Sequence, residues 1–262
     1  GGMRTAVITG ASSGIGAAFA HRLAARRANL ILTARSAGAL EQLAQTLAQR
    51  YSISVRTIPA DLAESGAARV LFDRVRADGS HVDLLINNAG FGKFAHFLAE
   101  DLSTYQRMLS LNINAVVDLT YLFIHDMRMR GSGGVINVAS TAAFQPVSYM
   151  AVYAASKSFV LSFTEALAGE YQKYGVHCLA LCPGNTATNF MTVANAITAG
   201  MSFARPEDVA EAGLTAYLRK RNSYVPGTLN YLLSLLPRLL SRDLAIVIAA
   251  RMFEKRVVAW TP

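Results

Sequence analysis

The sequence contains little cysteine. Its 262 residues include only Cys178 and Cys182, four positions apart in an apolar stretch typical of a β-strand. Four residues of strand span about 13 Å, whereas the Cα atoms of a disulfide lie within about 7 Å of each other. We therefore expect two buried free thiols. Additional cysteine, histidine or acidic residues at metal-ligand spacing are also lacking, so we expect no bound metal.

Charged residues are sparse as well. They make up 16% of the chain against 52% hydrophobic residues, a balance that excludes a disordered protein. Basic residues outnumber acidic ones by 25 to 17, but they are scattered and do not alternate with aromatic residues. We therefore expect no nucleic-acid partner. A cofactor with several phosphates or an anionic membrane surface would also favour the net charge of +8, so the charge alone identifies no partner.

Long apolar runs are lacking too. The longest near the C-terminus, residues 244–250, is far shorter than the roughly 18 residues that a membrane-spanning helix needs. Gly1 and Gly2 are interpreted as a cloning remnant before a natural start at Met3, and a strand-like segment follows without a signal-peptide pattern. Because no linker, repeat or low-complexity tract divides residues 3–262, we expect one cytoplasmic domain.

Short β-branched runs alternate with longer amphipathic segments. The expected strands are 4–9, 29–34, 54–58, 83–87, 134–139, 176–182 and 223–225. The expected helices are 14–27, 37–51, 65–78, 104–129, 152–174 and 206–219. Several strands are mostly apolar, which indicates burial on both faces, as in parallel sheets. The pattern predicts a Rossmann-type α/β fold, a doubly wound parallel sheet of about seven strands with helices on both faces.

Polar and glycine residues directly follow six of the expected strands. They are Thr9-Gly10, Arg35, Asp61, Asn88, Ser140 and Pro183-Gly184. In doubly wound sheets, ligands bind beyond the carboxyl ends of the strands, near the point where the strand order reverses. We therefore expect the functional site along this edge.

The segment TGASSGIG, residues 9–16, joins the first expected strand to the first helix. Its three glycines allow a sharp turn and a close approach of the backbone to a pyrophosphate, and the helix N-terminus offers free N–H groups. Ser12 and Ser13 add hydroxyl donors. An ordinary glycine-rich turn has a similar composition, so this loop needs support from other residues.

The end of the second expected strand bears on which nicotinamide cofactor binds. A carboxylate there would accept hydrogen bonds from the ribose of NAD, whereas an arginine accommodates the 2′-phosphate of NADP. The strand ends in Thr33-Ala34-Arg35-Ser36, without a carboxylate. Arg35 taken alone is more typical of a solvated surface residue, but its position after the glycine loop favours NADP(H).

Tyr153 and Lys157 lie four positions apart in an expected helix, so they share one face. A neighbouring ammonium favours the phenolate and would lower the tyrosine pKa toward the working range of an acid or base. Such pairs are also common in helices without catalytic function. Ser140 ends a buried strand, where its hydroxyl could hydrogen-bond an oxyanion beside the tyrosine, and this favours the catalytic interpretation.

Together these motifs resemble the short-chain dehydrogenase/reductase family, in its main single-domain branch, from about Met3 to Tyr224. The loop 9–16 is similar to the family's nucleotide loop, and Asn112 matches its catalytic asparagine. Three further segments are similar to parts of the family that contact the cofactor: Asp61-Leu62, the NNAG segment 87–90 and the PGNTAT segment 183–188.

The resemblance implies hydride transfer between NADP(H) and a carbonyl or secondary alcohol. Ser140 would polarise the substrate oxygen and Tyr153 would exchange the proton. Lys157 would hold the ribose and lower the tyrosine pKa, and Asn112 would position a water that links the lysine to solvent. The implied cofactor-binding residues are Gly10, Ser12, Ser13, Gly14, Ile15, Gly16, Arg35, Asp61, Leu62, Asn88, Ala89, Gly90, Tyr153, Lys157, Pro183, Gly184, Thr186 and Thr188.

The loops that complete the family's substrate pocket carry large apolar side chains in this chain. They are Phe91, Phe94, Phe144, Met150, Phe190 and Met191. Beside Ser140 they predict a bulky or apolar substrate, which is lipid-like, steroid-like or 3-oxoacyl. Core packing uses the same residue types, so that alternative stays open.

Residues 226–262 continue beyond the resemblance as an expected helical extension. Leu229, Leu232, Leu233 and Leu236 follow the spacing of an amphipathic helix, which Pro237 is expected to interrupt. A second apolar helix is expected over 242–256, with basic residues flanking the apolar ones. Our first interpretation is a lid or packing element; a subunit contact and a membrane-surface element are the alternatives.

A non-catalytic NADP-binding sensor of Rossmann fold is the alternative to an enzyme. Such relatives tend to lose the tyrosine or the lysine, and Tyr153 and Lys157 are both present. The expected partners are a small-molecule carbonyl or alcohol and further copies of the chain, in a homodimer or homotetramer.

Overall fold

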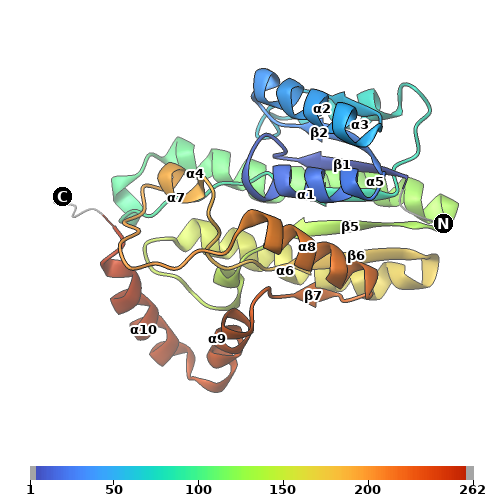
Figure 1. Cartoon of the computed structure of the whole chain (residues 1–262). Coiled ribbons are helices and arrows are strands. Elements are labelled where there is room, and N and C mark those ends of the chain that lie inside the picture. The colour runs from blue at the N-terminus through green and yellow to red at the C-terminus, as the bar shows by residue number, and fades with distance from the viewer. Residues whose placement is uncertain (1–3, 258–262) are drawn as a thin grey trace.

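A seven-stranded parallel sheet forms the centre of the protein. The computed structural model describes residues 4–257, so the expected start of the chain and the last five residues of the extension lie outside the described part. The strand order is β3-β2-β1-β4-β5-β6-β7 (Figure 1). The strands are β1 Thr5–Thr9, β2 Asn29–Thr33, β3 Val55–Thr57, β4 Leu84–Asn87, β5 Gly133–Val138, β6 Val176–Leu181 and β7 Ser223–Tyr224. The predicted α/β fold is confirmed.

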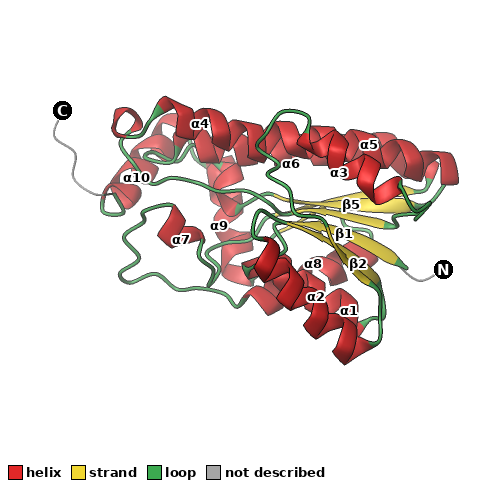
Figure 2. Ribbon diagram, turned by 90° about the horizontal axis from the view of Figure 1, so that it is seen from above, coloured by secondary structure: helices red, strands yellow, loops and turns green. Residues whose placement is uncertain are grey.

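Helices cover both faces of the sheet. Figure 2 shows α1, α2 and α8 on one side and α3, α4, α5 and α6 on the other. Their bounds are α1 Gly14–Ala25, α2 Ala37–Tyr51, α3 Ala67–Arg76, α4 Leu102–Leu109, α5 Ala115–Arg130, α6 Ala151–Tyr171 and α8 Pro206–Leu218. Short turns are η1 Phe97–Ala99, η3 Thr141–Phe144, η4 Gln172–Tyr174 and α7 Phe190–Val193. Neighbouring strand residues face opposite layers: Ile8 packs in the core with Phe19, and Val7 packs in the core with Phe123.

The strand order reverses between β1 and β4. On one side β1 pairs with β2, with Thr9 opposite Thr33, and on the other it pairs with β4, with Ile8 opposite Ile86. The loops after β1 and β4 therefore leave the sheet side by side, at the edge where ligands bind in this type of fold.

The segment expected as one helix over 104–129 has three parts. α4 and α5 flank a π-helical turn, η2 Ser110–Asn114. Taken together, Leu102–Arg130 is long and apolar enough to cross a membrane by length and composition alone, which sequence analysis did not predict. However, 44% of its most apolar window is buried, and its inner face supplies Leu119 and Phe123 to the core. It therefore has the packing of a core helix.

Cys178 and Cys182 are both free and buried, as predicted. Burial raises the pKa of each thiol to about 12. Both therefore stay protonated near neutral pH, where the nucleophilic form of cysteine is the thiolate.

The C-terminal extension forms two helices, α9 Thr228–Leu239 and α10 Arg242–Glu254. The prediction that Pro237 interrupts the first helix is wrong. The helix continues for two residues beyond it, and the Leu240 N–H donates to the Leu236 carbonyl at 3.2 Å. Because Pro237 lies in the last turn, its missing N–H removes a bond only where the helix is about to end.

Candidate active site

The loop between β1 and α1 forms a cradle of backbone that side chains would fill. Gly10 and Gly14 have φ angles of +62° and +56°, in the left-handed region that favours glycine. A Cβ on Gly16 would overlap the Gly10 carbonyl oxygen. Ser13 caps α1 without a side-chain hydrogen bond, so the first N–H groups of the helix are available to an anion. The predicted loop residues thus lie together: Gly10, Ser12, Ser13, Gly14, Ile15 and Gly16.

Hydrogen bonds from the segment after β4 hold this loop. Asn88 Nδ2 donates to the carbonyls of Thr9 and Gly10 at 3.1 Å and 3.2 Å. The backbone N–H groups of Asn88 and Ala89 both donate to Thr9 Oγ1 at 2.9 Å. A Cβ on Gly10 would lie only 2.9 Å from Ala89 Cα. The NNAG segment therefore packs directly on the glycine loop.

Arg35 and Asp61 follow β2 and β3 on the outer side of the cradle. Arg35 is exposed, and its positive charge acts on the Asp61 carboxylate. Asp61 forms an ion pair with Arg107 of α4, while its neighbour Leu62 is buried. Burial is the largest single influence and works to raise the pKa of Asp61, but the hydrogen bonds from Arg107 and the Ala63 N–H, with the charges of Arg107 and Arg35, together lower the pKa. Sequence analysis missed Arg107, because a contact across 46 positions leaves no local signal.

Ser140, Tyr153 and Lys157 converge at the carboxyl end of β5. Ser140 directly precedes η3, and the other two lie in the first turns of α6. The Tyr153 hydroxyl is hydrogen-bonded with Ser140, whose Oγ also accepts the Ala142 N–H at 3.1 Å. Lys157 Nζ donates to the Val138 carbonyl at 2.9 Å and lies 5.7 Å from the centroid of the Tyr153 ring.

Burial determines the protonation of this group. Tyr153 is 8% exposed, and burial raises its pKa to about 12 despite the hydrogen bond from Ser140. Burial lowers the pKa of Lys157 to about 8. The expectation that Lys157 lowers the tyrosine pKa therefore differs from the structure. The lysine donates to the Val138 carbonyl, and the loss of hydration at Tyr153 is the larger effect.

Asn112 is buried in the π-turn η2 and ties it to the segment after β4. Its Nδ2 donates to the Phe91 carbonyl at 2.9 Å and to Ser156 Oγ at 3.1 Å, and its Oδ1 accepts the Phe91 N–H at 3.2 Å. A Cβ on Gly90 would lie 3.0 Å from this Oδ1 and 3.4 Å from Lys157 Nζ. The carboxamide thus lies beside the lysine with its bonds made to protein groups, including Ser156, which sequence analysis missed.

The segment after β6 runs past the cradle. Gly184, which follows Pro183, has no space for a Cβ because Asn230 of α9 lies against it. Thr186 Oγ1 donates to the Gly184 carbonyl at 3.0 Å. Thr188 faces the glycine loop, since a Cβ on Gly14 would lie 2.8 Å from its Cγ2.

Large apolar side chains gather around Tyr153. Five of the six predicted pocket residues pack in one cluster with it: Phe91, Phe94, Met150, Phe190 and Met191. Phe144 does not belong to this group, and its predicted contact with substrate stays a prediction. It packs in a separate cluster that includes Val225, because η3 lies against α6 and α9.

Phe190 packs against the tyrosine, and residues at and just after the end of α10 pack in the same cluster. The ring centroids of Phe190 and Tyr153 are 5.1 Å apart. Phe253 of α10 packs 6.1 Å from Phe94, and Val257 is buried in the same cluster. Sequence analysis missed both C-terminal residues, because the positions they contact are far away in the chain. The ring of Tyr153 is therefore enclosed on this side by apolar side chains from α7 and the C-terminal extension.

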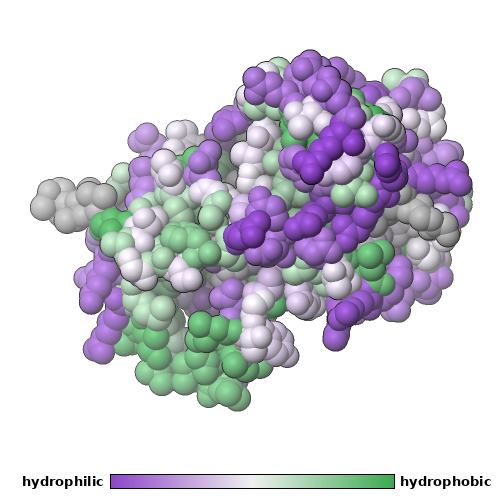
Figure 3. All heavy atoms as spheres, in the orientation of Figure 1, coloured by the Kyte–Doolittle hydropathy of each residue, from purple (hydrophilic) through white to green (hydrophobic). Residues whose placement is uncertain are grey.

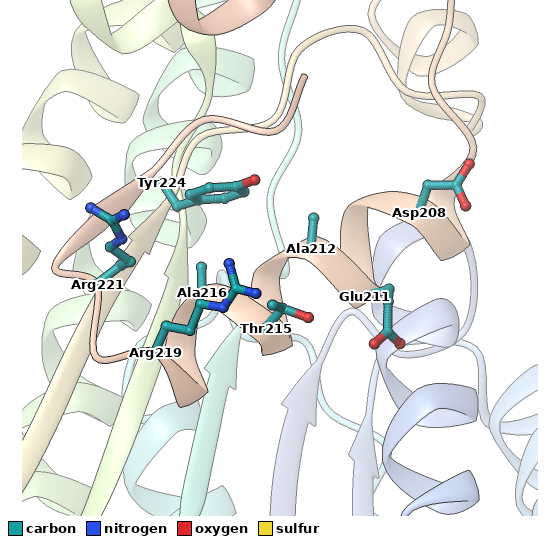
Figure 4. A pocket seen from close by; sticks show the side chains of 8 residues that line it. All are labelled: Asp208, Glu211, Ala212, Thr215, Ala216, Arg219, Arg221 and Tyr224. Atoms are coloured by element: carbon teal, nitrogen blue, oxygen red, sulfur yellow. The ribbon is translucent and has the colours of Figure 1, made fainter. Parts of the chain in front are cut away.

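A surface hollow on α8 and β7 lies away from these residues (Figure 4). Its lining consists of Asp208, Glu211, Ala212, Thr215, Ala216, Arg219, Arg221 and Tyr224. None of the predicted catalytic, cofactor or substrate residues lines it, so it plays no part in the site. Within residues 4–257, no group of three or more histidine, cysteine or acidic side chains is arranged to hold a metal ion.

Known proteins share both the sequence and the fold. The very-long-chain 3-oxoacyl-CoA reductase of Anas platyrhynchos is 32% identical over 194 residues, which are 72% of this chain but only 61% of that protein. Ketoacyl reductase HetN of Nostoc sp. is 30% identical over 227 residues, 85% of this chain and 78% of that protein. A solved short-chain dehydrogenase from Sphingobium yanoikuyae in complex with NADPH has a TM-score of 0.82 at 28% identity, covering 95% of this chain and 94% of the other.

The family comparison covers strands β1 to β6, the glycine loop and the group of Ser140, Tyr153 and Lys157. Residues 4–198, well over half of the chain, match the model of the short chain dehydrogenase family. The matched part includes Asn112, Ser140, Tyr153 and Lys157 and ends before α8. The chain belongs to the short chain dehydrogenase family.

Proposed function

We propose that this protein is an NADP(H)-dependent oxidoreductase that interconverts a carbonyl and a secondary alcohol. The observation that carries the proposal is the buried Tyr153 hydroxyl, hydrogen-bonded with Ser140 at the edge of the sheet where the glycine loop also opens. A binding protein without chemistry has no need of a buried phenol beside a buried lysine at that edge.

The glycine loop and Arg35 fit a phosphorylated dinucleotide. The backbone cradle of Gly10, Gly14 and Gly16 leaves space only because these residues lack a Cβ, and α1 points its N-terminus into it. Arg35 would hold the 2′-phosphate, and solved relatives in complex with NADPH support NADP(H) over NAD. When bound, NADPH supplies the hydride that reduces the carbonyl carbon.

The protein's own residues handle the proton. The high pKa of Tyr153 keeps the phenol protonated at neutral pH, so it suits donation to the substrate oxygen during reduction. The Ser140 hydroxyl would donate a second hydrogen bond to that oxygen. Lys157, whose pKa of about 8 lies near neutrality, would pass a proton toward the phenolate that remains. Asn112 would act as a positioning residue for the lysine.

The substrate that fits this site best is bulky or apolar. The cluster of aromatic and methionine side chains around Tyr153 would contact a lipid-like, steroid-like or 3-oxoacyl group. The names of relatives point the same way: a very-long-chain 3-oxoacyl-CoA reductase, a 17-beta-hydroxysteroid dehydrogenase type 3 and an alcohol dehydrogenase described as bulky-bulky ketone specific.

The test is NADPH consumption with a panel of 3-oxoacyl thioesters, steroid ketones and bulky aromatic ketones. We expect turnover that Tyr153→Phe lowers by at least about 100-fold while NADPH affinity is retained. Tyr217→Phe is the matched control, because Tyr217 is also a buried tyrosine but lies on α8 outside the site. Tight NADPH binding without turnover on the whole panel would instead support the non-catalytic sensor.

We further propose that residues 3–262 fold as one domain, located in the cytoplasm and assembled as a homodimer or homotetramer. Exposed apolar residues on α4 and α5 support a subunit contact there: Leu102, Tyr121 and Met129. A single cooperative unfolding transition and a multiple of the 28.1 kDa chain mass by light scattering are the expected results. A monomer or two separate transitions would contradict them.

A further inference from the structure

Helix α9 has the reverse of the usual amphipathic arrangement. Two of its polar residues face the protein: Asn230 lies against Gly184 and donates to the Pro226 carbonyl at 3.1 Å, and Ser234 is buried. The leucines expected to pack inward as a lid are instead exposed. In a helix that covers a core in water, the apolar stripe faces the core. These leucines therefore do not pack against the core, as the first interpretation of the extension, a lid or packing element, had expected.

Helix α10 continues the same surface. It turns Ala245 and Ala249 inward and exposes larger apolar residues. Figure 3 shows the resulting apolar region at one end of the molecule. We call it the C-terminal apolar surface; each of its residues is at least 41% exposed, and they are Leu229, Tyr231, Leu232, Leu233, Leu236, Leu239, Leu244, Ile246, Val247, Ile248 and Met252. An exposed apolar region of this kind marks a contact with an apolar partner.

Positive charge accompanies this surface. Four exposed basic residues lie on the same two helices or just after them: Arg238, Arg242, Arg251 and Lys255. The exposed acidic residues there are Asp243 and Glu254. With the formal net charge of +8 on the whole chain, this region is complementary to an anionic surface.

We propose that the C-terminal apolar surface docks on an anionic phospholipid membrane. The leucines of α9 and the aliphatic residues of α10 would enter the boundary between head groups and acyl chains. The long arginine and lysine side chains would reach the lipid phosphates. The docking goes beyond the proposed reaction, because it depends on neither NADP(H) nor a substrate.

A second copy of the chain is the less suitable occupant. In a two-fold contact, the same surface meets itself, and the exposed basic residues of this surface outnumber the acidic ones, so both copies would bring an excess of positive charge to the contact. That contact would bury like charges, which is unfavourable, whereas lipid phosphates neutralise them. The exposed apolar residues of α4 and α5 remain available for self-association.

The docked helices would adjoin the active site directly. Phe253 and Val257 pack in the cluster that surrounds Tyr153. Arg256 Nη1 donates to the carbonyls of Ile197 and Ala199 at 3.2 Å and 2.6 Å, in the segment that follows α7. An apolar molecule dissolved in the membrane would thus be close to the side chains that cover the tyrosine.

The test is flotation of the full chain with phosphatidylcholine vesicles and with mixed phosphatidylcholine–phosphatidylglycerol vesicles. We expect binding to the anionic vesicles, little binding to the neutral ones, and weakening at high salt. The double variant Leu232→Glu/Leu236→Glu is expected to lower the bound fraction at least about tenfold, because it removes two leucines from the lipid and adds negative charge. Arg238→Glu/Arg242→Glu is expected to abolish the preference for anionic vesicles.

Val70→Glu and Arg74→Glu are the matched controls, since both residues are exposed on α3 at the other end of the molecule. Both controls are expected to float like the unmodified protein. Failure of the unmodified protein to bind either vesicle overturns the proposal. So does a double leucine variant that binds vesicles normally but has a smaller assembled mass by light scattering, which would assign the surface to a second copy. NADPH consumption with a soluble ketone is measured in parallel, so that a failure of the proposed reaction is seen separately.

Discussion

At the level of single residues, burial sets the protonation states of the two groups at the centre of the site. Because of burial, the pKa of Tyr153 is raised to about 12 and the phenol keeps its proton well above neutral pH, whereas the pKa of Lys157 is lowered to about 8 and the ammonium is half deprotonated near that pH. Tyr153 therefore stays protonated, as the acid that reduction needs. Lys157 is the group whose charge changes in an accessible pH range. The pH dependence of the reaction should therefore report on Lys157 rather than on Tyr153.

We predict that kcat for NADPH-dependent reduction falls as the pH rises through about 8, because the pKa of Lys157 is lowered to about 8 and its deprotonated form no longer supplies a proton. Lys157→Arg keeps its charge throughout this range, so the remaining activity should lose this inflection even if the rate is lower. The measurement is the pH profile of kcat in both proteins. An unchanged inflection in the arginine variant would assign it to another group.

The sequence predicted which site residues converge but not their electrostatics. Two local patterns are reproduced in the structure: Ser140 follows a strand end, and Tyr153 and Lys157 share one helix face. The direction of the Tyr153 pKa shift depends on how deeply the ring is buried, which involves contacts with Phe190 and α10. Such contacts join distant parts of the chain and leave no periodic signal.

At the level of elements, the glycine loop depends on close packing of backbone against backbone. We predict that Gly16→Ala destabilises the protein by about 1–3 kcal/mol and abolishes NADPH binding, because the added methyl would overlap the Gly10 carbonyl oxygen. Gly38→Ala in α2 is the matched control. Nothing lies within 4 Å of its added methyl, so it should stabilise by about 0.5–1 kcal/mol.

The change in stability can be measured by chemical denaturation, and the change in NADPH binding can be measured by the fluorescence of the bound cofactor. A Gly16→Ala protein that binds NADPH with unchanged affinity would show that the cradle is not the cofactor site. Loss of binding in Gly38→Ala as well would show that the assay reports only general instability.

The strands could be predicted to within about two residues, and for β1, β2, β4, β5 and β6 the reason is that a strand buried on both faces is apolar along most of its length. Two other elements could not. The π-turn η2 inserts its extra residue without breaking the helical pattern of the flanking segments. The leucine spacing of α9 correctly predicted an amphipathic helix, but spacing alone does not say whether the apolar side faces the protein or the exterior.

At the level of the whole molecule, His177 couples folding to pH. It is buried in β6, its Nε2 has no hydrogen-bond partner among the described residues, and its ring lies 5.2 Å from that of Tyr217. Burial, with the nearby charge of Lys220, lowers its pKa below 6.5. The folded state therefore holds it neutral, while the unfolded chain takes up a proton as the pH falls through about 6.5.

We predict that the melting temperature drops as the pH falls below about 6.5, and that His177→Phe reduces this drop. His21, whose pKa burial also lowers, should account for part of the remainder. His125→Phe is the control, because its side chain is 69% exposed. Thermal melts of the three proteins between neutral and mildly acidic pH decide the matter. An equal drop in melting temperature in all three proteins would show that His177 does not contribute to the pH dependence of stability.

Arg256 connects the end of α10 to the segment that follows α7, and α7 itself begins with Phe190, which packs against Tyr153. If adhesion to lipid shifts α10, the loop over the tyrosine shifts with it, and the two binding equilibria become thermodynamically linked. Linkage is reciprocal: the factor by which lipid changes the affinity for substrate is the factor by which substrate changes the affinity for lipid. Each turnover would then be accompanied by a change in how tightly the protein adheres to lipid.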